Sequence, residues 1–139
     1  MNAEENLRIV ENWMDAMNRY NLEKMESFYT DDAVADEVPE PEVFAGKKAI
    51  TEAYRELFYA FPDCKSTTIN RVAGGDQVLF EILWEGTHKE EFRGILGTDK
   101  VVKLRIAYLF KLHEGKISRI TEYYDAATIL QQLDLLPEE

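Results

Sequence analysis

Residues 101–124 read VVKLRIAYLFKLHEGKISRITEYY, and this stretch decides the fold class. Apolar and polar residues alternate on both sides of His113-Glu114-Gly115, which is a turn sequence. Two strands are therefore predicted, Val101–Leu112 and Lys116–Tyr123, and the short turn between them favours an antiparallel pair. The alternate residues from Leu104 to Leu112 form the apolar face of the first strand, so we expect that face to meet helices.

Further strands are predicted upstream of this pair. Ser66–Ala73 and Gln77–Glu90 alternate in the same way and are joined by Gly74-Gly75, so four consecutive strands form an antiparallel meander. The segment from Gly94 to Lys100 connects the second of these strands to the third. A short strand is also predicted at Ala33–Glu37, before a proline-containing loop.

Four helices are predicted from apolar residues at helical spacing. They are Ala3–Tyr20, a short helix through Leu22 to Phe28, Lys47–Ala60 before Pro62, and a short amphipathic helix from Ala126 to Leu136. Helices that precede a run of strands favour an α+β fold. We therefore expect a cone, in which a curved antiparallel or mixed β-sheet is covered by three N-terminal helices and followed by a short C-terminal helix.

The composition suits one domain over residues 1–139, because a chain of this length buries a substantial core. The net charge of -11 disfavours nucleic acid and anionic membranes as partners. The single cysteine, Cys64, cannot form an internal disulfide, and no Cys/His cluster suggests a metal site. With an acidic N-terminus unlike a signal peptide, we expect a cytoplasmic protein without cofactors.

Several motifs resemble the SnoaL-like polyketide cyclase or ester cyclase family. They are WEGTHKEEFRG at 84–94, GTDKVV at 97–102, GKI at 115–117, EYYD at 122–125 and LQQL at 130–133. The segment FYTDDA at 28–33 and Gly46 are similar to the wider nuclear transport factor 2-like superfamily. The resemblance implies a conical pocket for a flat or compact apolar substrate, and a carboxylate that catalyses an intramolecular aldol closure.

Asp125 matches the aspartate that this family has just before its last helix. An aspartate walled by apolar groups such as Phe110 and Tyr124 can act as a base, because burial raises its pKa toward neutrality. The alternative is that Asp125 caps the helix that follows it. The family's cyclases pair this aspartate with a histidine on the long strand, and Val101–Leu112 has none, so either His88 substitutes or the chemistry differs.

His88 and Glu122 are two further candidates for the catalytic group. His88 continues the apolar face of its strand beyond Trp84, which places it at the pocket mouth as a proton shuttle or as a hydrogen-bonded histidine at a strand end. Glu122 either points into the cone or pairs with Arg119 at the surface.

The ketosteroid isomerases belong to the same superfamily and suggest a third set of residues. An ungapped comparison places Glu37 at the isomerase base, Trp13 at its oxyanion tyrosine and Tyr108 near its protonated aspartate. The alternatives are an exposed loop acid for Glu37 and core aromatic residues for Trp13 and Tyr108.

Two functions remain open from the sequence. The first is a cofactor-free acid–base catalyst, a cyclase or isomerase acting on a small, mostly apolar carbonyl compound. The second is a non-enzymatic domain that binds a hydrophobic ligand or mediates assembly. The outer sheet face, with Ala107 and Leu109, is expected to form a homodimer. The expected substrate-binding residues are Trp13, Tyr54, Phe58, Trp84, Tyr108, Phe110 and Tyr124.

Overall fold

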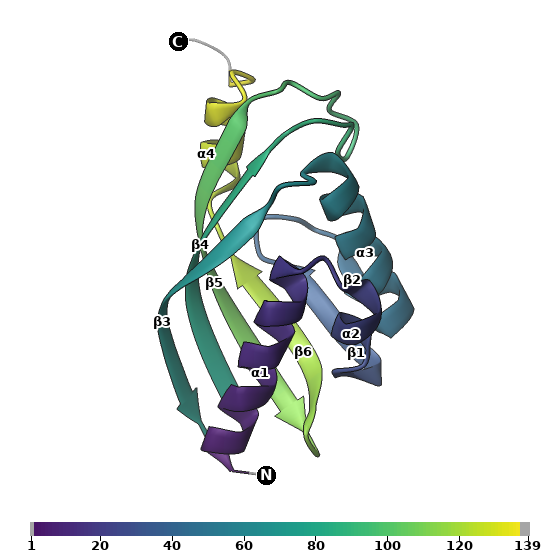
Figure 1. The fold of residues 1–139 in the computed structure, drawn as a ribbon, viewed down its shortest axis with the longest axis vertical. Coiled ribbons are helices and arrows are strands. Elements are labelled where there is room, and N and C mark those ends of the chain that lie inside the picture. The colour runs from purple at the N-terminus through teal and green to yellow at the C-terminus, as the bar shows by residue number, and fades with distance from the viewer. Residues whose placement is uncertain (1, 137–139) are drawn as a thin grey trace.

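A computed structural model describes residues 2–136 (Figure 1). The helices are α1 (Ala3–Asn18), α2 (Leu22–Glu26), α3 (Lys47–Ala60) and α4 (Ala126–Gln132). The strands are β1 (Tyr29–Glu37), β2 (Val43–Ala45), β3 (Lys65–Gly74), β4 (Gln77–Thr87), β5 (Val101–His113) and β6 (Lys116–Tyr123).

The six strands form one curved sheet in the order β2-β1-β6-β5-β4-β3. Strands β3 to β6 are an antiparallel meander, and β1 adds to β6 in parallel, so the sheet is mixed. Helices α1, α2 and α3 lie on one side of the sheet, and α4 lies beside the start of β5 (Figure 1). The predicted α+β fold is confirmed.

The core lies between this sheet and the helices. The alternate residues of β5 that were expected to face the helices, from Leu104 to Leu112, are buried, and Val102 before them is buried too. The Trp13 ring of α1 lies at the centre, with edge-on contacts to Tyr54, Tyr108 and Phe110. Aromatic edge-to-face contacts of this kind stabilise a core beyond the apolar area that they bury.

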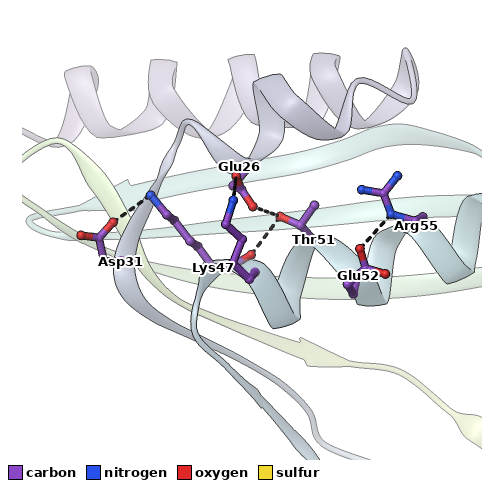
Figure 2. A network of polar contacts seen from close by, with 7 residues as sticks. Glu26, Asp31, Lys47, Thr51, Glu52 and Arg55 are labelled. Atoms are coloured by element: carbon purple, nitrogen blue, oxygen red, sulfur yellow. Dashed lines mark hydrogen bonds and ion pairs between the residues drawn. The ribbon is translucent and has the colours of Figure 1, made fainter.

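A polar network fixes α3 against α2 and β1 (Figure 2). Glu26 accepts hydrogen bonds from Lys48 Nζ at 3.0 Å and from Thr51 Oγ1 at 2.9 Å. Lys47 Nζ pairs with Asp31 at 2.8 Å. These contacts lower the pKa of the Glu26 carboxyl. The network thus joins the first turn of α3 to its two neighbours, and the opposite face of α3 is left to line the pocket.

The bounds of several elements differ from those predicted, and one strand was missed. Strand β1 begins at Tyr29 rather than Ala33, because Tyr29 already pairs with Ile117 of β6, and a register irregularity follows before Val34. Strand β2 was missed, since three residues give no detectable period. Strand β4 ends at Thr87 rather than Glu90, where Lys89 N instead donates to Ala60 O. Helix α4 ends at Gln132, before the left-handed Asp134.

Candidate active site

A cavity of about 320 Å³ lies between α3, the inner face of the sheet, α4 and the loop from residue 88 to 100. This volume is at the lower end of the range for small-molecule sites. Its lining is mainly apolar, and its charged residues are Glu37, Glu40, Arg93 and Glu122. The fold thus leaves a partly open, mainly apolar cavity with a few ionisable groups.

Three of the polar residues lie in one row across the sheet. Glu37 of β1 is in register with Glu122 of β6, and Glu122 is in register with Tyr108 of β5. Side chains in register on neighbouring strands point to the same face. All three residues line the cavity, so the mixed strand order brings an N-terminal carboxylate next to a C-terminal one.

Glu122 is held among tyrosines. The Tyr54 hydroxyl lies 3.4 Å from Glu122 Oε1, and the Tyr108 hydroxyl also interacts with this carboxyl. Burial, followed by the charge of Glu37, raises the pKa of Glu122 to about 8, although the two tyrosines and Arg93 act in the opposite direction. Burial also raises the pKa of Tyr54 and Tyr108, which keeps their hydroxyls protonated as donors. Glu122 can therefore gain or lose a proton near neutral pH.

Glu37 is engaged through both carboxylate oxygens. Arg93 Nη2 donates to Oε2 at 2.6 Å and Nη1 donates to Oε1 at 3.2 Å. The Tyr124 hydroxyl donates to Oε1 at 2.6 Å. Bidentate Arg–carboxylate pairs are among the stronger polar contacts in proteins. Glu37 is consequently better placed to hold Arg93 than to take a proton from a substrate.

Arg93 belongs to the loop between β4 and β5, which arches from the sheet toward the end of α3 (Figure 1). Its guanidinium lies over the Phe92 ring at 4.8 Å and near the Phe44 ring at 5.9 Å. Phe92 and Ile95 pair through two backbone hydrogen bonds and line the cavity from the same loop. The Glu37–Arg93 pair thus fastens this loop to the end of β1.

His88 lies directly after β4, where it lines the cavity and is only 1% exposed. Its Nδ1 is 3.1 Å from Thr98 Oγ1, and its ring stacks on Phe61 at 5.2 Å. Its Nε2 is buried and has no hydrogen-bond partner among the residues that the structure describes. His88 is therefore both hydrogen-bonded and left with one free ring nitrogen.

The prediction that Asp125 is a buried base is wrong. Asp125 is exposed, does not line the cavity, and accepts a hydrogen bond from Ala127 N at 3.0 Å as the N-cap of α4. The chain leaves the sheet after Tyr123, so the Asp125 carboxylate lies at the N-terminus of α4 instead of on the inner face of the sheet. Of the two roles considered for Asp125, catalytic base and helix cap, the structure supports the helix cap.

Three of the expected substrate-binding residues do not line the cavity. Trp13 is fully buried in the core, and its indole Nε1 donates to the Tyr29 hydroxyl at 2.8 Å. Phe110 is also a core residue, one pleat beyond Tyr108. Phe58 packs against Tyr20 on the side of α3 next to α1. The sequence could not show where along each element the cavity ends.

The structure brings together the remaining predicted residues, which all line one cavity. They are Glu37, Tyr54, Trp84, His88, Tyr108, Glu122 and Tyr124. Arg93 and Phe61 were missed. Phe61 stands immediately before the helix-ending Pro62 and could have been expected to pack inward, but Arg93 lies in a loop without any period to reveal its direction.

Two absences hold within residues 2–136. No helix there is long and apolar enough to cross a membrane. No group of three or more His, Cys, Asp or Glu in that range could hold a metal ion.

The model of SnoaL-like polyketide cyclases matches residues 7–133, nearly the whole chain. The chain belongs to the SnoaL-like polyketide cyclase family. The family resemblance that the motifs suggested is therefore confirmed. A comparison with curated proteins gives no match.

Solved structures share the fold of this SnoaL-like protein. TsrD from Streptomyces laurentii is 17% identical with a TM-score of 0.85, over 98% of this chain and 99% of that one. A protein described as a SnoaL-like polyketide cyclase, from Jannaschia sp. CCS1, is 17% identical with a TM-score of 0.88, over 97% and 95%. An epoxide hydrolase of Mycobacterium tuberculosis, described as LEH-like, is 19% identical with a TM-score of 0.76, over 94% and 90%.

Proposed function

We propose that this SnoaL-like protein is a cofactor-free acid–base catalyst, and that Glu122 is the group that moves the proton. The observation that supports this most is the position of Glu122, a carboxyl inside an apolar cavity with a pKa raised to about 8 by burial and by Glu37. A catalytic acid or base is most effective when its pKa lies near the working pH.

The substrate class follows from the lining of the cavity. The mainly apolar walls suit a small, mostly apolar compound, and the tyrosine hydroxyls suit a carbonyl oxygen. In the proposed step the ionised Glu122 takes a proton from the carbon next to the carbonyl. The electron pair of that C–H bond moves into an enolate, whose oxygen accepts hydrogen bonds from Tyr54 and Tyr108.

The enolate can then follow one of two routes. In an isomerase, Glu122 returns the proton to a different carbon of the same molecule. In a cyclase, the enolate carbon attacks a second carbonyl group of the substrate, and the new alkoxide receives the proton from Glu122. The proton balance closes in both routes, so no other reactant is required.

The test is exchange of solvent deuterium into candidate ketones, followed by NMR. We expect Glu122→Gln to slow enzyme-dependent exchange by a factor on the order of 10²–10⁴, because the amide cannot accept the proton. Asp125→Asn is the matched control and should exchange at the rate of the wild type, since Asp125 only caps α4. Undiminished exchange in folded Glu122→Gln protein would overturn the assignment.

The second candidate function is binding of a hydrophobic ligand without catalysis. The cavity favours it because the lining is largely apolar and Glu37 is already occupied by Arg93 and Tyr124. The same experiment separates the two functions. A ketone that binds in the cavity and exchanges no faster than in buffer would support the binding function.

A further inference from the structure

The cavity extends along β5 and has polar groups at both ends. Val102, Leu104, Ile106 and Tyr108 are alternate residues of this strand, and all four line the cavity. At roughly 3.3 Å per residue, the six-residue separation of Val102 and Tyr108 corresponds to about 20 Å of strand. Glu122 is in register with Tyr108. The cavity is therefore longer than the proton-transfer site requires.

His88 lies near the Val102 end. Val102 is in register with Gly86, and His88 N donates to Lys100 O at 2.9 Å beyond that pair. Nδ1 of His88 already makes a hydrogen bond with Thr98, so Nε2, which has no partner in the described part of the chain, is the ring atom that can bind a ligand. A buried polar nitrogen without a partner is costly, and such atoms in native structures are few.

The contacts of Thr98 suit a ring hydrogen on Nε2. Thr98 Oγ1 accepts a hydrogen bond from Lys100 N at 3.3 Å and lies 3.1 Å from His88 Nδ1. The His88 contact can run in either direction, because a hydroxyl group both donates and accepts. When the Thr98 hydroxyl donates to Nδ1, the ring hydrogen of His88 lies on Nε2, and the ring presents an N–H donor at this end.

The lining near His88 restricts what can accept this hydrogen bond. The cavity residues around it, Phe61, Trp84 and Val102, are apolar, and Arg93 of the same lining is paired with Glu37. A carboxylate or phosphate of the ligand would be buried at this end without a cationic partner, which is unfavourable. A neutral oxygen, as in an ether, ester, ketone or alcohol, therefore suits this end.

We infer that the Thr98 hydroxyl donates to His88 Nδ1, and that the substrate is an elongated, mostly apolar carbonyl compound with a second, neutral oxygen that accepts a hydrogen bond from His88 Nε2 while the carbonyl lies at Glu122. This inference rests on the proposed function of Glu122. His88 Nε2 is shielded from solvent, and Phe61 stacks on the ring. A ligand oxygen can therefore reach Nε2 only when the side chains at that end shift.

The test uses methyl alkyl ketones from methyl heptyl to methyl undecyl ketone. Each is compared with the counterpart in which an ether oxygen replaces the methylene next to the terminal methyl group. Calorimetry should show that the wild type binds the ether counterpart about 3- to 10-fold more tightly at one or more chain lengths, the range of a single neutral hydrogen bond. His88→Phe should bind both members of each pair equally.

A second measurement does not depend on the variant folding. The ring nitrogens of the wild type are followed by ¹⁵N NMR, where the two histidines, His88 and the exposed His113, report separately. The ether ketone should shift the His88 Nε2 signal and leave His113 unchanged, while the plain ketone should shift neither. An unshifted Nε2, or an ether preference that is absent in the wild type or persists in His88→Phe, overturns the inference.

The result also separates this inference from the proposed function. Glu122→Gln should keep the ether preference, because the His88 end is intact, and should lose only the deuterium exchange. If deuterium exchange is as fast in Glu122→Gln as in the wild type, and the preference for the ether ketone depends on His88, only the proposed function is overturned. If none of the ketones binds the wild type, both are overturned.

Discussion

At the scale of single residues, the Glu37–Glu122 pair concentrates the ionisation chemistry of this protein. The two carboxyls lie on neighbouring strands in register, but Arg93 and Tyr124 bind only Glu37. Glu37 thus forms an ion pair, whereas Glu122 faces tyrosine hydroxyls and apolar walls. Two carboxyls in unlike environments can take different roles in one reaction.

The raised pKa of Glu122 predicts how stability changes with pH. Between its ordinary pKa of 4.5 and its folded value of about 8, the folded chain binds more protons at this site than the unfolded chain. Stability should therefore be highest below about pH 4.5 with respect to this group and fall as the pH rises to about 8, by roughly 1–3 kcal/mol. Urea unfolding at a series of pH values measures this slope.

Glu122→Gln should flatten that slope, because the amide does not titrate. Glu26→Gln is the control, since the pKa of Glu26 is lowered and its contribution is lost only as the pH falls below about 4.5. A slope between about pH 5 and 8 that is the same in the wild type and in Glu122→Gln would contradict the assignment of the raised pKa.

Sequence patterns indicated most of the residues in the site but not their roles. The period of two placed Tyr108 and Trp84 on an inner face, and Glu122 was expected either to point into the cone or to pair with Arg119 at the surface. The motif favoured Asp125, which lies only three residues further on. The direction in which a side chain points at the end of a strand depends on tertiary contacts, and the sequence pattern does not show these contacts.

At the scale of elements, the loop from residue 88 to 100 is the segment whose position the sequence could least predict. Gly97 lies against the backbone of Lys89, where an added Cβ would collide with a carbonyl oxygen. Arg93 has a left-handed φ of 49° and is followed by Gly94 at 86°. These backbone features set the loop's path, and the Glu37–Arg93 pair fastens it.

Arg93→Gln should release this loop from β1. We expect amide hydrogen exchange of residues 89–96 to become several-fold faster, because the bidentate pair that closes the loop is lost. Lys89→Gln is the matched control, since Lys89 pairs with the exposed Asp99 in the same loop and this surface pair should change exchange little. Equal exchange in Arg93→Gln and the wild type would show that the pair does not hold the loop.

The capping role of Asp125 predicts a modest structural effect. Asp125→Ala should destabilise the protein by about 0.5–2 kcal/mol through loss of the hydrogen bond to Ala127 N. Thermal unfolding measures this change, and Asp125→Ser should recover most of it because serine is also a good cap. A loss of stability that serine does not recover would argue against capping.

The elements themselves were largely predictable. The helices α1 and α3 have apolar faces at helical spacing, and the strands β4 and β5 alternate between buried and more exposed residues along their whole length. The parallel pairing of β1 with β6 was not predictable in the same way. It joins segments that are far apart in the sequence, and no local period encodes such a contact.

At the scale of the whole molecule, the sheet face opposite α1 to α3 exposes apolar side chains. Val72, Leu79 and Leu109 lie in register across β3, β4 and β5. Leu79 is 38% exposed, and Tyr123 on β6 is 48% exposed. The homodimer predicted from Ala107 and Leu109 would cover this face.

Sedimentation of the purified protein tests the dimer. We expect a dimer at micromolar concentration and a monomer for Leu79→Lys, because a buried lysine in each subunit would oppose association. Leu96→Lys is the control, since Leu96 is 78% exposed on the loop away from this face and should leave the dimer intact. A wild type that sediments as a monomer at every concentration would contradict the expectation.

The parallel pairing of β1 and β6 has a consequence for synthesis on the ribosome. When β1 leaves the exit tunnel, the strand that it must join has not yet been translated, and some eighty residues separate the end of one from the start of the other. Long-range strand pairing of this kind slows folding. The nascent chain must therefore keep the β1 edge unpaired until the final strand emerges, which makes chaperone binding most valuable during that interval.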